Sequence, residues 1–184
     1  MIMFTQRQEE IFQGMMLGDG YLENRGTANT RLQIRHAISQ RSYVDWLYQE
    51  FENFVAKPPR QIGEAYFFRT RSYPWLTSLR KVYYPDGTKR IPSDLFLTPL
   101  GLAVWFMDDG YLDQKAAYFC THAFDTQSIE RARIMLSRYH LESGLVRDRN
   151  HFKIRLKVVS TPLFIKLIQS YIHSSLLYKI SKAP

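Results

Sequence analysis

Two aspartates, Asp19 and Asp109, stand in matching surroundings 90 residues apart in the sequence. Each is followed by Gly-Tyr-Leu, and each comes at the end of an apolar run. Carboxylate oxygens are the ligands that hard divalent cations prefer in proteins. The repeat therefore makes these two side chains the first candidates for a metal site.

The apolar runs that precede the aspartates predict two helices. The segments Gln8–Gly20 and Pro99–Gly110 carry apolar side chains at helical spacing and are apolar nearly all round. A helix without a polar face has to be buried. We expect the two helices to pack against each other, at a distance that the small residues Gly14, Gly18 and Ala103 keep short.

This packing would bring the two terminal carboxylates together at the negative ends of two helix dipoles, where anions are unfavourable. A divalent cation relieves that repulsion, and oxygen ligands suit Mg²⁺ better than zinc. The alternative is that Asp-Gly only closes each helix through a glycine in a left-handed turn. One such ending favours the alternative, whereas two that match over four residues favour a metal site at Asp19 and Asp109.

Two lysines share the same spacing from the aspartates. Lys89 lies 70 residues after Asp19, and Lys179 lies 70 residues after Asp109. A basic side chain near a metal-bound phosphodiester can stabilise the charge that develops there. Lysine is common, so the spacing alone leaves this role open. The five histidines form no HxxxH pattern, and we assign them no catalytic role.

The elements around the two motifs repeat as well. Each half predicts a helix, two strands, a helix, two strands and a helix, which is typical of a fused pseudo-dimer. We divide the chain into halves at 1–84 and 99–184, joined by a linker at 85–98. The remaining predicted elements are strands at 30–37, 65–71, 116–121 and 152–158 and helices at 42–54, from 74, at 128–139 and after 162.

The predicted strands carry cations on one face and apolar residues on the other. Such a face suits a polyanion, and a two-stranded ribbon fits a DNA major groove. Arg and Gln side chains can also recognise guanine and adenine by bidentate hydrogen bonds to the base edges. An ordinary solvated face is the alternative, but it usually includes acids, and none occurs between Lys153 and Lys157. The candidate DNA-binding residues are Arg31, Gln33, Arg35, Arg69, Arg71, Arg147, Arg149, Lys153, Arg155 and Lys157.

Composition agrees with a polyanionic partner. The 184 residues carry a formal net charge of +8 with a pI near 9.6, and both halves are basic. A single cysteine, Cys120, excludes a disulfide framework and a cysteine-based zinc site. The N-terminus predicts no secretory signal, and the longest apolar run, Leu100–Met107, is too short for a membrane span. We expect an intracellular protein that acts with the genome, without a membrane.

The two motifs, GMMLGDGYL and LAVWFMDDGYL, resemble those of the LAGLIDADG homing endonucleases in their single-chain form. Further sequence segments resemble the type 2 subfamily: RSYVDWLYQEF, the Lys89–Pro92 turn, Cys120–Phe124 and Leu177–Ile180. The resemblance extends from about Gln8 to Ile180, in the family's order.

The resemblance implies an α/β (α+β) fold of two αββαββα halves, with saddle-shaped antiparallel sheets and the motif helices at the interface. It implies a monomer that reads a long double-stranded DNA site through the major groove. It also implies Mg²⁺-dependent cleavage of both strands with short 3′ overhangs, and Mn²⁺ is expected to substitute. By position, the metal ligands would be Asp19, Asp109 and the carbonyls of Gly18 and Asp108, with Lys89 and Lys179 as active-site lysines.

Two other functions remain open on this scaffold. One is an RNA maturase that binds intron RNA and assists splicing, and the other is a DNA-binding protein that does not cleave. Retention of both acids and both lysines favours the endonuclease. The short segment before the first motif favours a free-standing enzyme over an intein.

Overall fold

The computed structural model describes residues 3–24, 26 and 29–181, and it contains two halves with the same order of elements. The first half comprises α1 (Gln6–Leu17), β1 (Tyr21–Asn24), β2 (Thr30–Ala37), α2 (Arg41–Phe51), β3 (Arg60–Ile62), β4 (Ala65–Arg69) and α3 (Pro74–Tyr83). The second comprises α4 (Pro99–Asp109), β5 (Gly110–Asp113), β6 (Ala116–Cys120), α5 (Thr126–Ser137), β7 (Ser143–Asp148), β8 (His151–Leu156) and α6 (Thr161–Ile168). This order confirms the predicted repeat.

Short 3₁₀ helices extend or connect these elements. They are η1 (Ile38–Gln40), η2 (Glu52–Phe54), η3 (Val158–Ser160), η4 (Gln169–Tyr171) and η5 (Ser174–Lys179). The helix predicted at 42–54 is therefore α2 continued by η2. In the described residues, none of the helices combines the length and the apolarity that crossing a bilayer would need.

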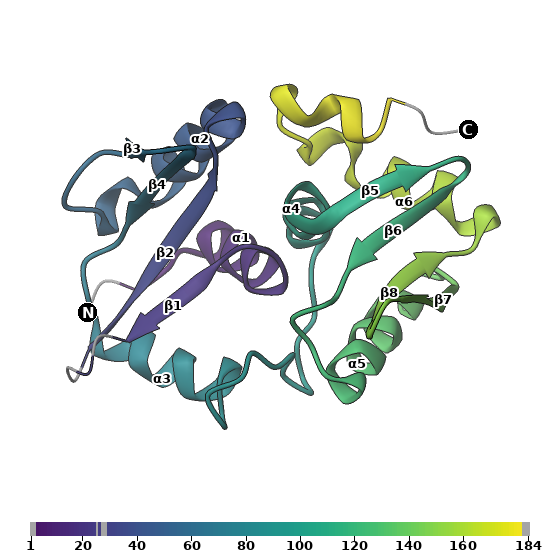
Figure 1. Cartoon of the computed structure of the whole chain (residues 1–184), viewed down its shortest axis with the longest axis horizontal. Helices are drawn as coiled ribbons and strands as arrows, with labels where there is room; N and C mark the ends of the chain where they lie inside the picture. The colour runs from purple at the N-terminus through teal and green to yellow at the C-terminus, as the bar shows by residue number, and fades with distance from the viewer. Residues whose placement is uncertain (1–2, 25, 27–28, 182–184) are drawn as a thin grey trace.

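Each half builds one four-stranded antiparallel sheet, with strand order β1-β2-β4-β3 in the first and β5-β6-β8-β7 in the second. The corresponding strands occupy the same places in the two sheets. Figure 1 shows the sheets on either side of a central pair of helices, α1 and α4. The predicted mixed fold of two antiparallel halves is confirmed.

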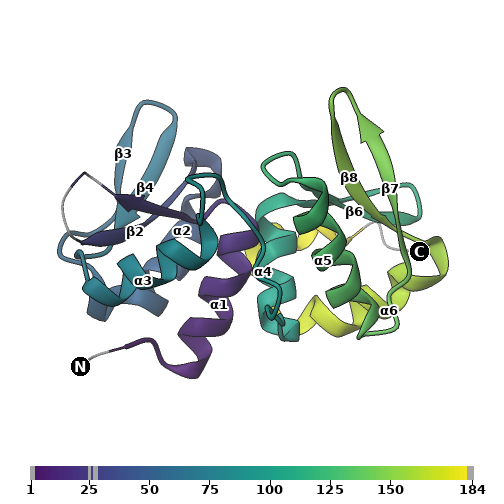
Figure 2. The same ribbon diagram turned by 90° about the horizontal axis from the view of Figure 1, so that it is seen from below.

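The central helices α1 and α4 lie side by side between the two halves (Figure 2). The segment Leu100–Met107 of α4 is buried throughout, and α1 buries Ile11, Phe12 and the run Met15–Leu17. A Cβ on Gly14 would lie 2.4 Å from the Gly101 carbonyl oxygen. The expected helix packing is confirmed, and on α4 the close approach falls at Gly101.

Replacing Gly14 by alanine is expected to destabilise the protein. The new methyl group would force the Gly101 backbone away, and overpacking of this kind costs about 1–3 kcal/mol. Urea unfolding of Gly14→Ala should therefore give a lower free energy of unfolding. The neighbouring variant Gln13→Ala, at a partly exposed position on the same helix, should stay within about 0.5 kcal/mol of the wild type. Equal stability of the two variants would contradict the close contact.

The segment between the halves packs on the second half. Ile91 is buried, its N–H donates to Ser128 Oγ (3.1 Å), and its carbonyl accepts from Arg131 Nη1 (2.7 Å). Tyr139 Oη donates to the Leu97 carbonyl (2.8 Å). The assignment of 85–98 as a linker and the domain bounds at 84 and 99 stay predictions, but this segment is held in place by α5. That attachment also positions Lys89.

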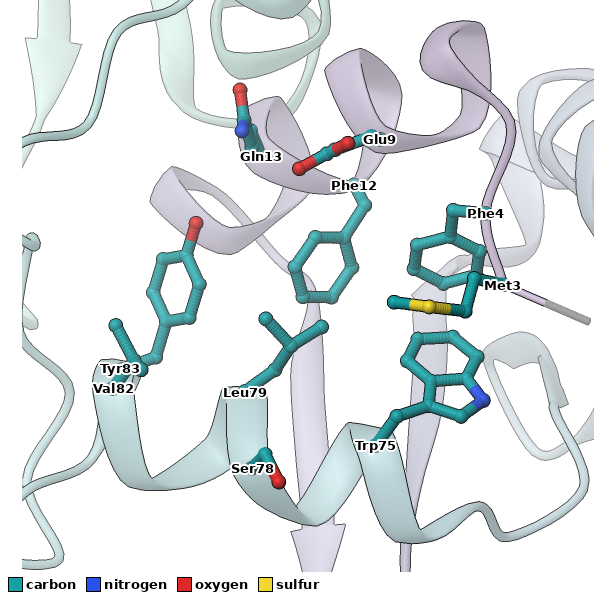
Figure 3. A pocket seen from close by; sticks show the side chains of 10 residues that line it. All are labelled: Met3, Phe4, Glu9, Phe12, Gln13, Trp75, Ser78, Leu79, Val82 and Tyr83. Atoms are coloured by element: carbon teal, nitrogen blue, oxygen red, sulfur yellow. The ribbon is translucent and has the colours of Figure 1, made fainter. Parts of the chain in front are cut away.

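An apolar hollow lies between the N-terminal segment, α1 and α3 (Figure 3). The Phe4 ring packs edge-on against Trp75, with centroids 4.6 Å apart, and Phe12 packs against Tyr83 at 5.8 Å. None of the residues that line it is a predicted site residue.

Candidate active site

The two motif helices end without left-handed glycines. Gly18 follows α1 with φ −106°, and Gly110 follows α4 with φ −93°. The positive-φ glycines of the described chain lie elsewhere, and Gly20 is not among them. A Cβ on Gly20 would lie 2.8 Å from the Met15 carbonyl oxygen, and one on Gly110 would meet the Phe106 ring at 2.1 Å. Tight packing, and not a left-handed helix cap, therefore explains Asp-Gly at both ends.

The Asp108 side chain links the two halves beside these ends. Its Oδ2 accepts from the backbone N–H of Asp19 (3.0 Å), and its Oδ1 accepts from Tyr43 Oη (2.8 Å). A Cβ on Gly18 would lie 2.4 Å from Asp108 Cβ, so a glycine is needed opposite this carboxylate. Asp108 therefore fixes the position of the Asp19 backbone across the interface.

The carboxylates at this junction lie in an environment that disfavours their charge. Burial, with the nearby charge of Asp19, raises the pKa of Asp108 to about 8 and that of Asp109 to about 7. The Asp19 side chain is 45% exposed, so it can reach a ligand outside the protein. A divalent cation between Asp19 and Asp109 would offset their repulsion, and the site fits Mg²⁺ or Mn²⁺ by charge and by its oxygen donors.

The two lysines occupy equivalent places at the two helix ends. Lys89 Nζ donates to the carbonyls of Gly18 (2.7 Å) and Gly20 (2.9 Å). Lys179 Nζ donates to the carbonyls of Met107 (2.6 Å), Gly110 (3.0 Å) and Asp108 (3.3 Å).

Each ammonium group thus binds backbone carbonyls at the C-terminal end of a motif helix. Burial lowers the pKa of Lys89 to about 8 and also lowers the pKa of Lys179. The proposed carbonyl ligands at Gly18 and Asp108 each already accept from a lysine, although a carbonyl oxygen has a second lone pair.

His36, to which the sequence pattern gave no role, lies within the site. Its Nδ1 is 3.3 Å from Asp19 Oδ2 and 2.8 Å from Gln40 Oε1, and burial lowers its pKa. His36 follows Leu32 and Ile34 on the buried face of β2. A polar residue at the end of that apolar series is the signal that could have singled it out.

Asp19, His36 and Asp108 each place one potential ligand atom within 4.8 Å of the others, which makes them a second group that could hold a metal. However, the Asp108 side chain accepts hydrogen bonds from Tyr43 and from the Asp19 backbone, and it is only 1% exposed. An imidazole ligand also suits zinc or other transition metals better than Mg²⁺. The Asp19–Asp109 pair is therefore the better candidate for a hard cation.

The outward face of the first sheet carries the predicted cations. Along β2, Arg31, Gln33 and Arg35 alternate with buried residues, and Arg69 of β4 lies directly opposite Gln33. Arg71 follows β4, and a groove beside it is lined by five cations that include two residues not predicted, Lys57 and Arg60. These cations are Arg31, Lys57, Arg60, Arg69 and Arg71.

Glu23 also lies on this face, where it pairs with Arg31 (2.6 Å) and with Arg69 (3.3 Å). The face is therefore not made of cations alone.

The second sheet confirms part of the predicted face and corrects the rest. Lys153 and Arg155 alternate with the buried Ile154 and Leu156. Arg147, however, lies opposite Phe152, and residues directly opposite on paired strands share a face. Arg147 is therefore on the other face from Lys153, because the β7–β8 register differs from the even spacing assumed along the sequence.

Two further predicted positions lie outside the strands. Arg149 lies in the β7–β8 turn with φ 56°, so it does not continue the alternation of β7. Lys157 follows β8, where the chain turns into η3. It pairs with Glu142 and lines a hollow with residues of α5, away from the outward face.

The outward face of the second sheet contains residues that sequence reasoning missed. Tyr111 and Tyr118 stack with centroids 5.1 Å apart, and Arg155 Nε donates to Tyr118 Oη (2.9 Å). Asp148 pairs with Lys153 (2.7 Å) and lies 3.0 Å from His122. These contacts depend on strand register, which the periodicity of one strand does not reveal.

Comparison with known proteins identifies the class to which this fold and site belong. A sequence model of the LAGLIDADG DNA endonuclease family matches residues 9–164. The match covers most of the sequence, and the chain belongs to the LAGLIDADG DNA endonuclease family. By family it is a DNA endonuclease, as the two motifs predicted.

Individual relatives agree with this assignment. The structure of the homing endonuclease I-WcaI bound to its DNA recognition sequence superposes with a TM-score of 0.88 at 23% identity, covering 98% of this chain and 88% of that one. The DNA endonuclease I-ChuI of Chlamydomonas applanata is 24% identical, over 96% of this chain and 95% of that protein. The cytochrome b mRNA maturase bI2 of Debaryomyces hansenii is 28% identical, over 93% of this chain and 72% of that protein.

Some relatives are longer than this chain. The chain spans 46% of the Saccharomyces cerevisiae bI2 maturase.

Proposed function

We propose that the chain hydrolyses both strands of a long double-stranded DNA site in the presence of Mg²⁺, with Asp19 and Asp109 as the metal ligands. The observation that carries the proposal is the convergence of these two acids with Lys89 and Lys179 at the junction of α1 and α4. On either side of that junction lies a sheet whose outward face bears cations. Double-stranded DNA laid on both faces would pass over the acids.

The residues of the chain then have separate tasks. Asp19 and Asp109 would hold the cation, with the Gly18 and Asp108 carbonyls as further ligands. Asp108 and Tyr43 fix the Asp19 backbone. A bound Mg²⁺ supplies charge stabilisation at the scissile phosphate and lowers the pKa of water.

The ammonium groups of Lys89 and Lys179 add positive charge beside the scissile phosphates. That placement would stabilise the charge that develops on the phosphate oxygens during in-line attack by water. His36 is held beside Asp19 by the Gln40 contact, where it limits the orientations of that carboxylate.

Direct evidence would come from a cleavage selection. The purified protein would be incubated with a randomised duplex library in Mg²⁺, in Mn²⁺ and in EDTA, and the cut ends would be sequenced. We expect one family of sites cut on both strands in Mg²⁺ and in Mn²⁺, and no cutting in EDTA. The protein should elute as a monomer. Cutting that persists in EDTA would refute the metal-dependent mechanism.

The Mg²⁺ requirement should depend on pH. A cation binds the ionised form of Asp109, so below its pKa of about 7 a proton has to leave before the metal can bind. Raising the pH from 6 to 8 ionises the group, and the Mg²⁺ concentration for half-maximal cleavage should fall, by up to about tenfold per pH unit below pH 7. A titration of cleavage rate against Mg²⁺ at each pH tests this, and a requirement that is independent of pH would contradict it.

The maturase relatives favour one second candidate, an intron-RNA-binding function. Such a function would not need the acids. Binding of a structured intron RNA by the Asp19→Asn, Asp109→Asn protein, together with absence of DNA cleavage by the wild type, would support it.

A further inference from the structure

Each sheet has a row of three opposed residues, one on each of three strands, that begins with a tyrosine and ends with an arginine. In the first half, Tyr21 of β1 lies opposite Gln33 of β2, which lies opposite Arg69 of β4. In the second, Tyr111 of β5 lies opposite Tyr118 of β6, which lies opposite Arg155 of β8. Since opposed residues share a face, each row lies on the outward side of its sheet.

The arginine of each row is anchored through Nε to the middle residue of the row, and Arg69 Nε also lies 3.3 Å from Glu23 Oε2. Arg69 Nε donates to Gln33 Oε1 (2.7 Å), and Arg155 Nε donates to Tyr118 Oη (2.9 Å). Each guanidinium also lies over an aromatic ring, with Arg69 Cζ 4.9 Å from the Phe67 centroid and Arg155 Cζ 5.9 Å from that of Tyr118.

Two unlike acceptors, an amide and a phenol, thus hold equivalent arginines through the same nitrogen. The terminal nitrogens of a guanidinium form a planar fork whose geometry matches O6 and N7 of guanine.

The second row shows that the space beside the fork is open. Gly144 of β7 lies directly opposite Arg155, and a Cβ built on Gly144 would meet no atom within 4 Å. Among the described residues, Arg155 Nη1 and Nη2 have no hydrogen-bond partner in the protein. The stacked Tyr111 and Tyr118 rings support the other side.

The rows are also tied to the catalytic acids. Tyr21 and Tyr111 each follow their acid by two residues, so the two rows are related by the same pseudo-symmetry as Asp19 and Asp109. Two arginines in pseudo-symmetric positions would contact the two half-sites at equal distances from the centre of the target, on opposite strands.

On this basis, and resting on the proposed function, we infer that Arg69 and Arg155 are paired specificity-determining residues that each read one guanine. The target then contains two guanines, one on each strand, at equal distances from its centre. Gln33 and Tyr118 are the positioning residues that orient the guanidinium groups of Arg69 and Arg155. Cations without such an anchor, for example Arg35, would serve the DNA backbone.

Binding selection from a randomised duplex library in Ca²⁺ tests the inference. The wild type should enrich the symmetric guanine pair. Arg155→Ala should lose the preference for one guanine only, by roughly 5- to 150-fold, the range of one bidentate contact. Arg69→Ala should lose the other. Lys166→Ala removes one charge from the exposed side of α6 in the same half, and it should keep both preferences.

Two variants separate base reading from simple charge. Arg155→Lys keeps the cation but not the fork, so it should lose the guanine preference while the salt dependence of binding is unchanged. Tyr118→Phe removes the acceptor of Arg155 Nε and should relax the same position, with affinity averaged over all sequences kept within about twofold.

The inference is overturned if Arg155→Ala weakens binding to all sequences equally and lowers the salt slope by about one, which is the signature of a phosphate contact. It is also overturned if the wild type selects and cuts a site without the guanine pair, while the endonuclease function stands. A wild type that enriches no sequence and cuts none would refute the proposed function, and the inference with it.

Discussion

Asp19→Asn and Asp109→Asn should each lose double-strand cleavage, by on the order of a thousandfold or more. A metal contact at a scissile phosphate contributes several kcal/mol to the transition state, and about 4 kcal/mol corresponds to a factor of a thousand. Asparagine keeps the size of the side chain but is a poorer ligand. The measurement is the cleavage rate of the selected site in Mg²⁺.

The fold of both variants should be intact. The hydrogen bond across the interface uses the Asp19 backbone and the Asp108 side chain, and neither substitution removes it. Asp109 is half-buried with a raised pKa, so a neutral group there costs little. Affinity for the site in Ca²⁺ should therefore change little.

Asp94→Asn is the matched control for charge. Asp94 lies exposed in the segment between the halves, and this variant should cut at the wild-type rate. If Asp19→Asn or Asp109→Asn also cut at that rate, the altered residue would have no part in the mechanism.

The second large effect is expected at the lysines. Lys89→Met or Lys179→Met removes an ammonium group that we propose to lie beside the scissile phosphates, and loss of one such group typically costs about 10²–10³-fold in rate. Lys89, with its pKa lowered to about 8, is still mainly charged at pH 7, so the charge is present when the enzyme acts. The measurement is the single-turnover rate of cleavage in Mg²⁺, with the affinity for DNA in Ca²⁺ as the reference.

A purely structural role is the competing account, because each lysine also caps helix-end carbonyls. If the role is structural, the methionine variants should have a lower melting temperature. Their DNA binding should also weaken in proportion to their loss of cleavage rate. Lys81→Met, on the exposed face of α3, controls for loss of charge alone. A slow Lys89→Met protein that binds DNA at the wild-type affinity would favour direct action on the phosphate.

Much of the fold could be predicted because the sequence repeats and its elements have clear periods. The strand at 30–37 was predicted with its observed bounds, since hydrophobic alternation there is unbroken. The helix from Pro99 begins where a proline and the N-cap Thr98 place it. The predicted strand at 65–71 ends earlier, at Arg69, because Thr70 forms only an isolated bridge with Val55.

The site was less predictable, because its parts meet through tertiary contacts. The repeat singled out Asp19 and Asp109 at the helix ends, whereas spacing alone left the role of Lys89 and Lys179 open. The structure places both lysines at the same helix ends. Nothing local in the sequence indicated that the Asp108 side chain would cross the interface to the Asp19 backbone and Tyr43.

The faces of the sheets also needed information that one strand does not contain. Period-two spacing placed Arg147 with Lys153, but the register of β7 with β8 puts them on opposite faces. The turn between these strands takes Arg149 out of the alternation. Cross-strand register is a property of the pair, and it determines which cations can share a DNA surface.

The most direct test of the account is to locate the metal. Crystals of the protein with its selected duplex and Mn²⁺ would give anomalous diffraction peaks at the bound ions. We predict peaks within ligand distance of the carboxylates of both Asp19 and Asp109. An ion held instead by Asp19, His36 and Asp108, with Asp109 uninvolved, would contradict the proposed catalytic pair.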